Sequence, residues 1–350
     1  MIKNTIYWSP AYPDEYSFPV DGNYPVDRYD SVVELAKHSA TADYFNWEKI
    51  QPVTDGYNSD AEGLESNITI QVEDLCRGIS DNYLHKLLSN GSAHSSEVFV
   101  SDLQAATGTI AAVESALADK ATNFHLGGGH HHAHRGGSSA PQFNLINDII
   151  LGLEKAKTDD QVTKTLTIDL DLHFADGTVR EIRNSEVDYH LSLHQWGIFP
   201  CVDSGWKNYS GKGNGDGTIF NYPLPGGIGG ESYMAVLKQS LRKIMAQVDP
   251  DLIIYQAGVD THYRDQLGTL NLVLQDLFER DRIVLDETAG VPTIVLSGGG
   301  YGPCAAKATV NTLAAINGDK IIFTGDEKIG SVEARKKLST WYGDSCINIG

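Results

Sequence analysis

The clearest hydrophobic pattern in the chain is a series of short, continuously apolar segments separated by longer segments with helical periodicity. The apolar segments predict strands at residues 5–8, 122–126, 165–173, 187–194, 251–260, 292–298 and 320–324. The periodic segments predict helices at residues 31–41, 72–89, 101–120, 143–157, 231–248 and 264–288, and a loop at the beginning of the last segment stays open as an alternative. Apolar strands that alternate with helices are typical of a parallel sheet covered on both faces. The pattern therefore predicts an α/β fold.

No internal repeat, low-complexity segment or linker interrupts this pattern. We therefore expect a single domain over residues 1–350, a length that one large α/β domain can fill. Residues 9–66 are rich in Tyr, Asp, Asn, Pro and Gly. We interpret this region as long loops that form a rim over the core.

The most informative segment is TLTIDLDLHFADG, residues 165–177, in which Asp169, Asp171 and His173 occupy every second position. Side chains two apart on a strand point the same way, so two carboxylates and an imidazole would share one face. Burying them without partners would cost several kcal/mol per charge, whereas a divalent metal such as zinc accepts these ligands. The segment alone leaves open that it is a strand end whose acids are solvated at a loop mouth.

Polar residues follow the carboxyl ends of four predicted strands. GGGHHHAH follows Phe124, DLDLHFADG follows Ile168, GVDTH follows Tyr255 and SGGGY follows Leu296. In open parallel sheets, binding sites lie beyond the carboxyl ends of the strands. We therefore expect these four loops to converge on one crevice.

Within that crevice, Asp260 would complete a three-ligand metal site with Asp171 and His173. Three protein ligands leave a position open for water and substrate, as catalytic zinc requires. Helix capping is the alternative role for an acid at this position. Tyr301 follows a glycine run, where its hydroxyl could polarise a substrate carbonyl or its ring could simply pack against the loop.

The histidine run after residues 127–129 supplies candidate acids and bases. Two imidazoles there could transfer protons near neutral pH if a carboxylate fixed the tautomer of each. Asp169 and Asp176 are candidates for those carboxylates. A cluster of surface histidines is the alternative interpretation.

The amino-acid composition restricts the classes of partner that the chain is expected to bind. The chain has 27 Lys and Arg residues against 46 Asp and Glu, a formal net charge of −19, which repels nucleic acid and anionic membranes and favours cationic ligands. The four cysteines are far apart and form no CxxC pair, so neither a disulfide framework nor a thiolate zinc site is indicated. No apolar segment suits a signal peptide or a membrane span. We therefore expect a cytoplasmic protein that binds neither nucleic acid nor membrane.

Five segments together resemble the zinc-dependent histone deacetylase and acetylpolyamine amidohydrolase family. In chain order they are GGGHHHAH, TIDLDLHFADGT, LSLH, YQAGVDTHYRDQLGTLNL and LSGGGY. Each is weak alone, but five in order over roughly residues 105–315 are specific. The resemblance implies an arginase-like α/β fold, with an eight-stranded parallel sheet, helices on its faces and long loops at the carboxyl ends of the strands. It also implies hydrolysis of N-acyl amines to acid and amine.

The resemblance assigns roles to residues of this chain. By similarity, zinc would be bound by Asp171, His173 and Asp260. The catalytic groups would be the tandem His131 and His132, oriented by Asp169 and Asp176, and the carbonyl-activating Tyr301. A potassium ion would contact Asp169, Asp171, His173, Ser192 and Leu193. The substrate tunnel would include Phe143, Phe199, Leu267 and Gly299.

Some positions depart from the family pattern. His130 stands where the family often has another residue, and Phe174 and Ala175 replace the usual residues of an HHGDG segment. Ile79 occupies a position that usually carries histidine, and the first hundred residues fit poorly. No basic tail is present, so histones are not the obvious substrate.

The sequence thus predicts a zinc-dependent amidohydrolase that removes an acyl group, in the simplest case acetyl, from a cationic small-molecule or peptide substrate such as acyl-lysine or acetylpolyamine. The chain could also form a homo-oligomer. Three alternatives remain open: an arginase-like dinuclear hydrolase, an N-deacetylase of a small biosynthetic metabolite, and a non-catalytic acyl-lysine-binding module.

Overall fold

The main sheet contains eight strands, and every neighbouring pair in it is parallel. Their order across the sheet is β2 (Asn46–Lys49), β1 (Thr5–Trp8), β3 (Thr122–Leu126), β10 (Thr293–Leu296), β9 (Leu252–Gln256), β6 (Thr165–Asp169), β7 (Asp188–Gln195) and β8 (Ile219–Leu224). A separate antiparallel pair consists of β4 (Ala133–His134) and β5 (Gly137–Ser138). The computed structural model describes residues 4–8, 28–37, 39, 45–49, 74, 77–89, 93–141, 143–326, 328 and 331–342.

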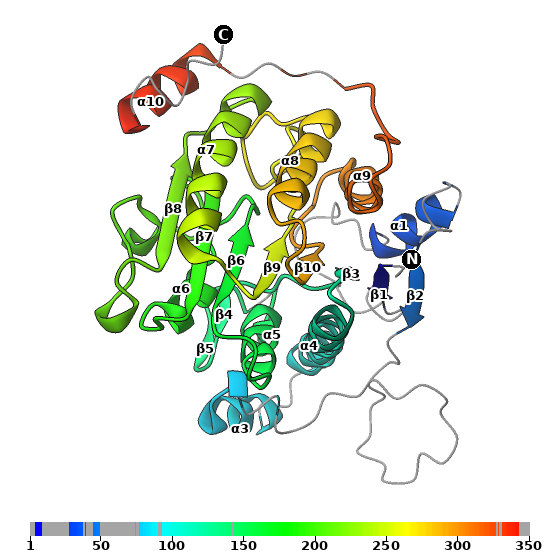
Figure 1. Ribbon diagram of the computed structural model, residues 1–350, viewed down its shortest axis with the longest axis vertical. Helices are drawn as coiled ribbons and strands as arrows, with labels where there is room; N and C mark the ends of the chain where they lie inside the picture. The colour runs from blue at the N-terminus through cyan, green and yellow to red at the C-terminus, as the bar shows by residue number, and fades with distance from the viewer. Residues whose placement is uncertain are drawn as a thin grey trace.

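Helices cover both faces of the sheet (Figure 1). One face is covered by α4 (Ala93–Asp119), α5 (Asp148–Ala156) and α6 (Asp176–Ile182), with α3 (Asp81–Ser89) outside them. The other face is covered by α1 (Arg28–Lys37), α7 (Gly230–Val248), α8 (Leu274–Glu287) and α9 (Ala305–Asn317). The last helix, α10 (Val332–Tyr342), contacts β8 through the stacked rings of Tyr342 and Tyr222. The predicted α/β class, with a helix-flanked parallel sheet, is confirmed.

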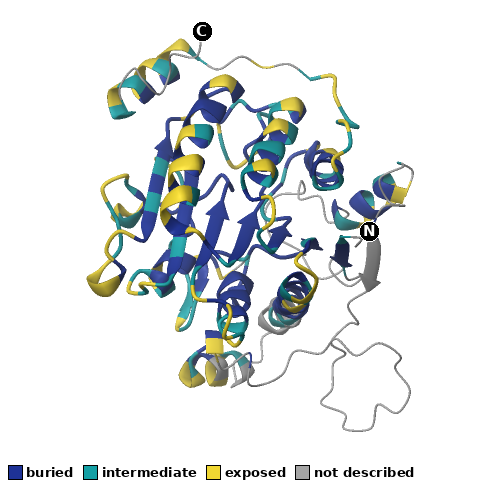
Figure 2. Ribbon diagram, viewed as in Figure 1, coloured by how far each residue is buried: buried dark blue, intermediate teal, exposed yellow. Residues whose placement is uncertain are grey.

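The continuously apolar strands are explained by burial on both faces (Figure 2). In β9, Ile253 and Tyr255 belong to one hydrophobic cluster, whereas Leu252 and Ile254 belong to the cluster on the opposite face. All four side chains are inaccessible to solvent. A strand buried on both faces needs apolar residues at every position, so β9 shows no hydrophobic alternation.

The sheet differs from the prediction at its edges. β8 was not predicted, because it contains polar residues and Pro223; proline lacks the N–H needed for a central strand and is tolerated at the edge that β8 occupies. β2 lies inside the region that was interpreted as loops, most of which is outside the described residues.

The strand predicted at residues 320–324 is wrong. The backbone N–H groups of Ile322 and Phe323 donate to Oδ1 of Asn311, and Nδ2 of Asn311 donates to the carbonyl oxygen of Phe323. The Asn311 side chain therefore bonds the backbone groups of this segment that would otherwise pair with a neighbouring strand. Ile322 and Phe323 still pack against the core, which accounts for the apolar pattern.

Two helices begin inside their predicted segments, and the loop before α8 agrees with the alternative for the beginning of residues 264–288. Asn147 caps α5 by accepting the N–H of Ile150 at 3.0 Å, so the helix begins at Asp148. Asp276 accepts the N–H of Val273 at the beginning of α8, and the preceding ten residues form a loop. The predicted helix at residues 72–89 lies partly outside the described residues, and its described part ends in α3.

A buried arginine holds the central loops in place. Arg280 of α8 has no solvent exposure and donates to the carbonyl oxygens of Ala257 and Gly258, at 3.2 and 2.6 Å, and of Leu170, at 3.4 Å. Its charge is paired with the equally buried Asp281 at 2.9 Å. Arg280 therefore joins the segment that follows β9 to the segment that follows β6.

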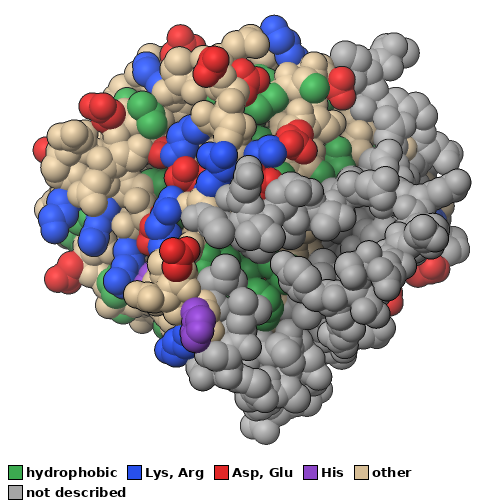
Figure 3. Space-filling model, turned by 90° about the horizontal axis from the view of Figure 1, so that it is seen from below, with side chains coloured by type: hydrophobic (Ala, Val, Ile, Leu, Met, Phe, Trp, Pro, Cys, Tyr) green, Lys and Arg blue, Asp and Glu red, His purple; other side chains and the backbone are tan. Residues whose placement is uncertain are grey.

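Surface features add two observations. On the face shown in Figure 3, basic and acidic side chains are interspersed over the described part of the surface. Among the helices that the structure describes, none has both the length and the apolar composition to cross a bilayer.

We expect Arg280→Met to lower the free energy of unfolding by about 3–5 kcal/mol, because it leaves the Asp281 carboxylate buried without its cation. Urea denaturation measures this difference. Arg282→Met is the matched control, since the Arg282–Asp286 pair is largely exposed and such pairs contribute about 0–1 kcal/mol. Equal unfolding free energies in the two variants would show that the buried pair has no special role.

Candidate active site

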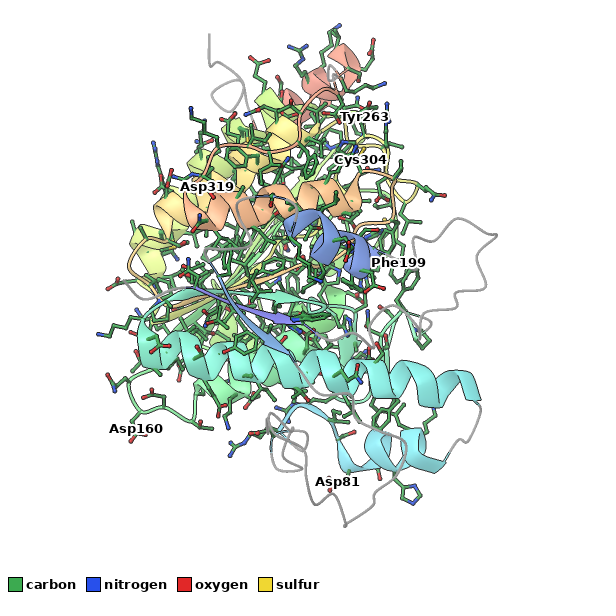
Figure 4. The ribbon with its side chains drawn as sticks, turned by 90° about the vertical axis from the view of Figure 1, so that its right-hand side faces the viewer. Asp81, Asp160, Phe199, Tyr263, Cys304 and Asp319 are labelled. Carbon is green, nitrogen blue, oxygen red and sulfur yellow. The ribbon has the colours of Figure 1, made fainter. Side chains whose placement is uncertain are left out.

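Four neighbouring strands in the middle of the sheet supply the candidate site. β3, β10, β9 and β6 are adjacent in the strand order, so their carboxyl ends lie side by side. Figure 4 shows the resulting polarity: Phe199, Tyr263 and Cys304 lie toward one side of the molecule, and Asp160 and Asp319 lie toward the other. The four loops identified in the sequence analysis therefore lie at the same edge of the sheet.

Three buried side chains converge in the arrangement expected of metal ligands. Nδ1 of His173 lies 3.2 Å from Oδ1 of Asp171 and 3.1 Å from Oδ2 of Asp260. The candidate ligand atoms of all three residues lie within 4.8 Å of one another. The other oxygen of Asp260 accepts the N–H of Leu172 at 2.9 Å, and the other oxygen of Asp171 accepts the N–H of Gly299 at 2.9 Å. Backbone groups thus orient each carboxylate toward the imidazole.

The strand that carries these residues is shorter than predicted. β6 ends at Asp169 because the following N–H groups turn back to side chains: Asp171 N–H donates to Asp169 Oδ1 at 3.1 Å, and His173 N–H donates to Asp171 Oδ1 at 2.9 Å. Such local carboxylate–backbone bonds compete with a strand ladder. Both carboxylates nevertheless face His131, whose Nδ1 is 2.8 Å from Asp169 and whose Nε2 is 3.7 Å from Asp171.

The electrostatics of the three converging groups favour a cation between them. Burial raises the pKa of Asp260 to about 7, with a further contribution from the charge of Asp171. Burial alone would lower the pKa of His173, but its hydrogen bonds to Asp171 and Asp260 raise it to about 10. A proton is therefore held where two carboxylates meet one imidazole. Two oxygens and one nitrogen form a donor set that suits zinc.

Each of the tandem histidines lies against a carboxylate. His132 Nδ1 lies 2.8 Å from Asp176 Oδ1, and the centroids of the His131 and His132 rings are 4.3 Å apart. Burial opposes protonation of His131, but Asp169 and Asp171 raise its pKa to about 9. Burial and the neighbouring His131 lower the pKa of His132 to about 4. One imidazole is therefore charged at neutral pH and the other is neutral.

Tyr301 is positioned by a carboxylate to which the sequence analysis gave no role. Asp265 Oδ2 accepts the N–H groups of Tyr301 and Gly302 at 2.7 and 3.0 Å, and its Oδ1 accepts the N–H of Leu267 at 3.0 Å. Asp265 is buried and lies in the GVDTHYRDQLGTL segment. In the sequence, Asp265 is only one carboxylate in a polar segment. Its role could not be read there, because its partner Tyr301 is far along the chain.

Asp148 is a second residue that sequence reasoning missed. It is fully buried and accepts the N–H groups of Gly129 at 3.1 Å and His130 at 2.7 Å, and the hydroxyl of Thr109 at 2.5 Å. Gly129 has φ +108°, a conformation that glycine adopts readily. Asp148 therefore holds the turn that leads into the histidine pair.

All four predicted tunnel residues line one pocket with the groups above. The pocket is lined by Phe143, Phe199, Leu267 and Gly299, together with Asp171, His173, His131, His132 and Tyr301. Phe199 and Leu267 are 46% and 38% exposed, so they lie at the mouth. The Phe199 ring is 5.0 Å from the His132 ring, and the Phe143 ring is 6.0 Å from the Tyr301 ring.

Of the residues predicted around potassium, three lie on adjacent strands, and Asp171 and His173 follow β6. Asp169 of β6 is paired in register with Ser192 of β7, and Leu193 follows it. Ser192 and Leu193 are fully buried, and the Ser192 hydroxyl shares a hydrogen bond with Nδ1 of His194 at 2.8 Å. Potassium binding by these residues stays a prediction.

A second cluster of possible ligands was not predicted. Atoms of His262, Cys304 and Asp326 lie within 4.8 Å of one another. Nε2 of His262 lies 2.7 Å from Asp326 Oδ2, and the other Asp326 oxygen accepts the N–H of Leu274 at 3.1 Å. Through Asp326, these hydrogen bonds join the segment after α9 to the loop after β9 and to the beginning of α8, which is a structural role.

The histone deacetylase domain profile matches residues 35–316 of this chain. The chain belongs to the histone deacetylase family. Human histone deacetylase 1 is 35% identical over 176 residues, which cover 50% of this chain and 35% of the human protein. The acetoin utilization protein AcuC of Staphylococcus aureus is 33% identical over 199 residues, which cover 55% of this chain and 50% of AcuC.

An uncharacterized protein of Picosynechococcus sp. is 33% identical over 201 residues, which cover 57% of this chain and 62% of that protein. The chain therefore matches between about a third and three-fifths of the length of these family members. The matched region in this chain includes every side chain of the site described above.

We expect zinc affinity to rise with pH. The pKa of His173 is raised from 6.5 to about 10, so at neutral pH its imidazole holds a proton that a metal must displace. Release of one proton makes the affinity rise about tenfold per pH unit below that pKa, and Asp260, with a pKa of about 7, steepens the rise below neutrality. Competition with a chromophoric chelator at several pH values measures it. A pH-independent affinity would place zinc away from His173.

Proposed function

We propose that the protein is a zinc-dependent amidohydrolase that removes an acyl group, in the simplest case acetyl, from an N-acylated amine such as acyl-lysine or acetylpolyamine. The observation that carries this proposal is that Asp171 and His173, which converge with Asp260, line one pocket with two carboxylate-held histidines and Tyr301. Metal ligands, proton-transfer groups and a phenol are the parts that metal-assisted amide hydrolysis requires.

The three converging ligands leave room for water and substrate, as catalytic zinc sites do. When bound there, zinc would supply Lewis-acid polarisation of the acyl carbonyl and would lower the pKa of a water molecule. Every other step is assigned to the chain's own side chains.

The two histidines have different roles in this proposal. Nδ1 of His132 faces Asp176, so the tautomer with Nδ1 protonated leaves Nε2 free to accept a proton from the attacking water. His131, paired with Asp169, stabilises negative charge that develops beside it. The histidine pair then protonates the departing amine and the C–N bond breaks. The proton left on the new carboxylic acid passes to the amine, so the products are an ammonium ion and a carboxylate.

Tyr301 would donate its hydroxyl hydrogen bond to the acyl oxygen as negative charge develops there. Asp265 fixes the backbone of Tyr301 and Gly302, so the donor is positioned before the reaction. A preorganised donor of this kind contributes about 3–4 kcal/mol to the transition state.

The mouth of the pocket favours an alkyl amine. Phe143 and Phe199 offer apolar walls, and the chain's net charge of −19 attracts a cationic substrate. The relatives' names include a histone deacetylase and an acetoin utilization protein, so both peptide and small-molecule substrates belong in the assay. A metabolite N-deacetylase would prefer one small amide, and a non-catalytic acyl-lysine reader would show no turnover. A dinuclear hydrolase would contain two equivalents of metal.

We expect Tyr301→Phe to lower kcat by about 10²–10³-fold, because one transition-state donor is lost, while the zinc content stays unchanged. Release of free amine from acetyl-lysine peptides and acetylpolyamines measures the rate. Tyr263→Phe is the control, because Tyr263 lies outside the pocket and its hydroxyl contacts Arg264. Unchanged turnover in Tyr301→Phe would remove the phenol from the mechanism.

We expect Asp260→Ala to purify with little zinc and no turnover, because one of three ligands is missing. Elemental analysis of the purified protein gives the metal count, and circular dichroism shows whether the fold is retained. Asp286→Ala, an exposed acid on α8, should keep a full equivalent of zinc. Stoichiometric zinc in a folded Asp260→Ala protein would contradict the assignment.

A further inference from the structure

The pocket differs in character between its mouth and its buried end. The exposed mouth is apolar, with Phe199 and Leu267 at 46% and 38% exposure. The buried lining includes Arg28, Asn144 and His130, which carry a guanidinium, an amide and an imidazole. Arg28 is 4% and Asn144 is 5% exposed, and the His130 side chain is 13% exposed. An aliphatic acyl chain would offer these polar groups no further hydrogen-bond partner, whereas an acyl group with its own acceptor would.

Arg28 brings positive charge to this end. Its guanidinium donates to the backbone carbonyl oxygens of Ser297 at 3.1 Å and Gly298 at 2.9 Å rather than to a carboxylate. Its Nε has no hydrogen-bond partner among the described residues. A buried cation bonded to neutral carbonyls keeps its full charge, so an anion nearby is stabilised.

His130 is held in this lining by a carboxylate behind it. Asp102 of α4 is fully buried; its Oδ2 accepts the N–H groups of Leu145 and Ile146, and its Oδ1 lies 3.0 Å from His130 Nδ1. The contact is an ion pair rather than a well-aligned hydrogen bond. Burial lowers the pKa of His130, but the Asp102 charge outweighs it and the pKa is raised. A protonated imidazole has a second N–H that a pocket ligand can use.

The position of the open mouth determines which side of a bound amide faces the buried end of the pocket. An amide bound at the metal ligands has an amine side and an acyl side. The amine side continues into a peptide or polyamine and has to leave through the open mouth. The acyl side therefore points to Arg28 and His130.

We propose that the buried end binds an acyl group that carries its own carboxylate, so that the preferred substrate is the half-amide of a dicarboxylic acid, such as an N-succinyl amine, with His130 as a specificity-determining residue. This inference rests on the proposed amidohydrolase function. The reaction is still hydrolysis: the water oxygen bonds to the acyl carbon, the C–N bond breaks and the amine leaves with both protons of the water. The products are an ammonium ion and a dicarboxylate.

Succinyl and butyryl groups on one amine form a matched pair, because both have four carbons and only succinyl has a terminal carboxylate. We expect the wild-type protein to favour the succinyl amide by about tenfold or more in kcat/KM, as one charge-assisted contact provides. His130→Phe should reduce that ratio about tenfold. Asp102→Asn, which keeps the shape but removes the charge behind His130, should reduce it in the same direction. His134→Gln, a histidine outside the pocket, should leave the ratio unchanged.

Binding of the free acids separates this inference from the proposed function. On the zinc-loaded protein, calorimetry should show tighter binding of succinate than of butyrate, and His130→Phe should remove the difference. Turnover of acetyl and butyryl amides with no succinyl preference and equal binding of the two acids would overturn the inference and keep the function. Absence of all turnover together with a His130-dependent preference for succinate would overturn the function and keep the carboxylate site. A succinyl preference that persists in a folded His130→Phe protein would overturn the role of His130.

Discussion

The site depends on one electrostatic constraint: two buried carboxylates are held against one imidazole at the wall of the pocket. The negative charge of Asp171 and Asp260 is balanced by protons on His173 and on neighbouring groups, which a bound metal cation would replace. Backbone N–H groups, Gln256 and the buried Arg280 fix the surrounding loops. Several hydrogen bonds thus keep the three groups together, which is typical of a binding site rather than of an ordinary core.

Carboxylates also lie against the other histidines of the pocket, but the protonation state of these histidines differs. Asp169 keeps His131 charged, whereas His132 stays neutral beside Asp176 because burial and the charge of its neighbour oppose protonation. Pairs of titratable groups whose pKa values are driven apart are typical of acid–base catalysis. The chemical difference between adjacent imidazoles therefore arises from packing, not from residue type.

The sequence revealed those parts of the site that follow directly from strand order. Asp171, His173, Asp260 and Tyr301 could be predicted because each follows an apolar strand, and parallel strands end at one edge. Asp265, Asp148 and Asp102 could not, because their roles depend on partners brought close only by the folded chain. The edges of the sheet could not be predicted for a related reason. β8 carries polar residues and a proline, so its sequence does not look like a strand. Residues 320–324 are apolar, but their backbone is bonded to a side chain of α9.

The placement of the ligands on neighbouring strands has a consequence for assembly. β6 and β9 are already joined by their own ladder, in which Asp169 pairs with Gln256, directly before the segments that supply Asp171, His173 and Asp260. An ion at that position links two strand ends that the backbone has already brought together. The strand ladder itself therefore sets the spacing of these three side chains, so an ion that bound among them would meet a preformed site.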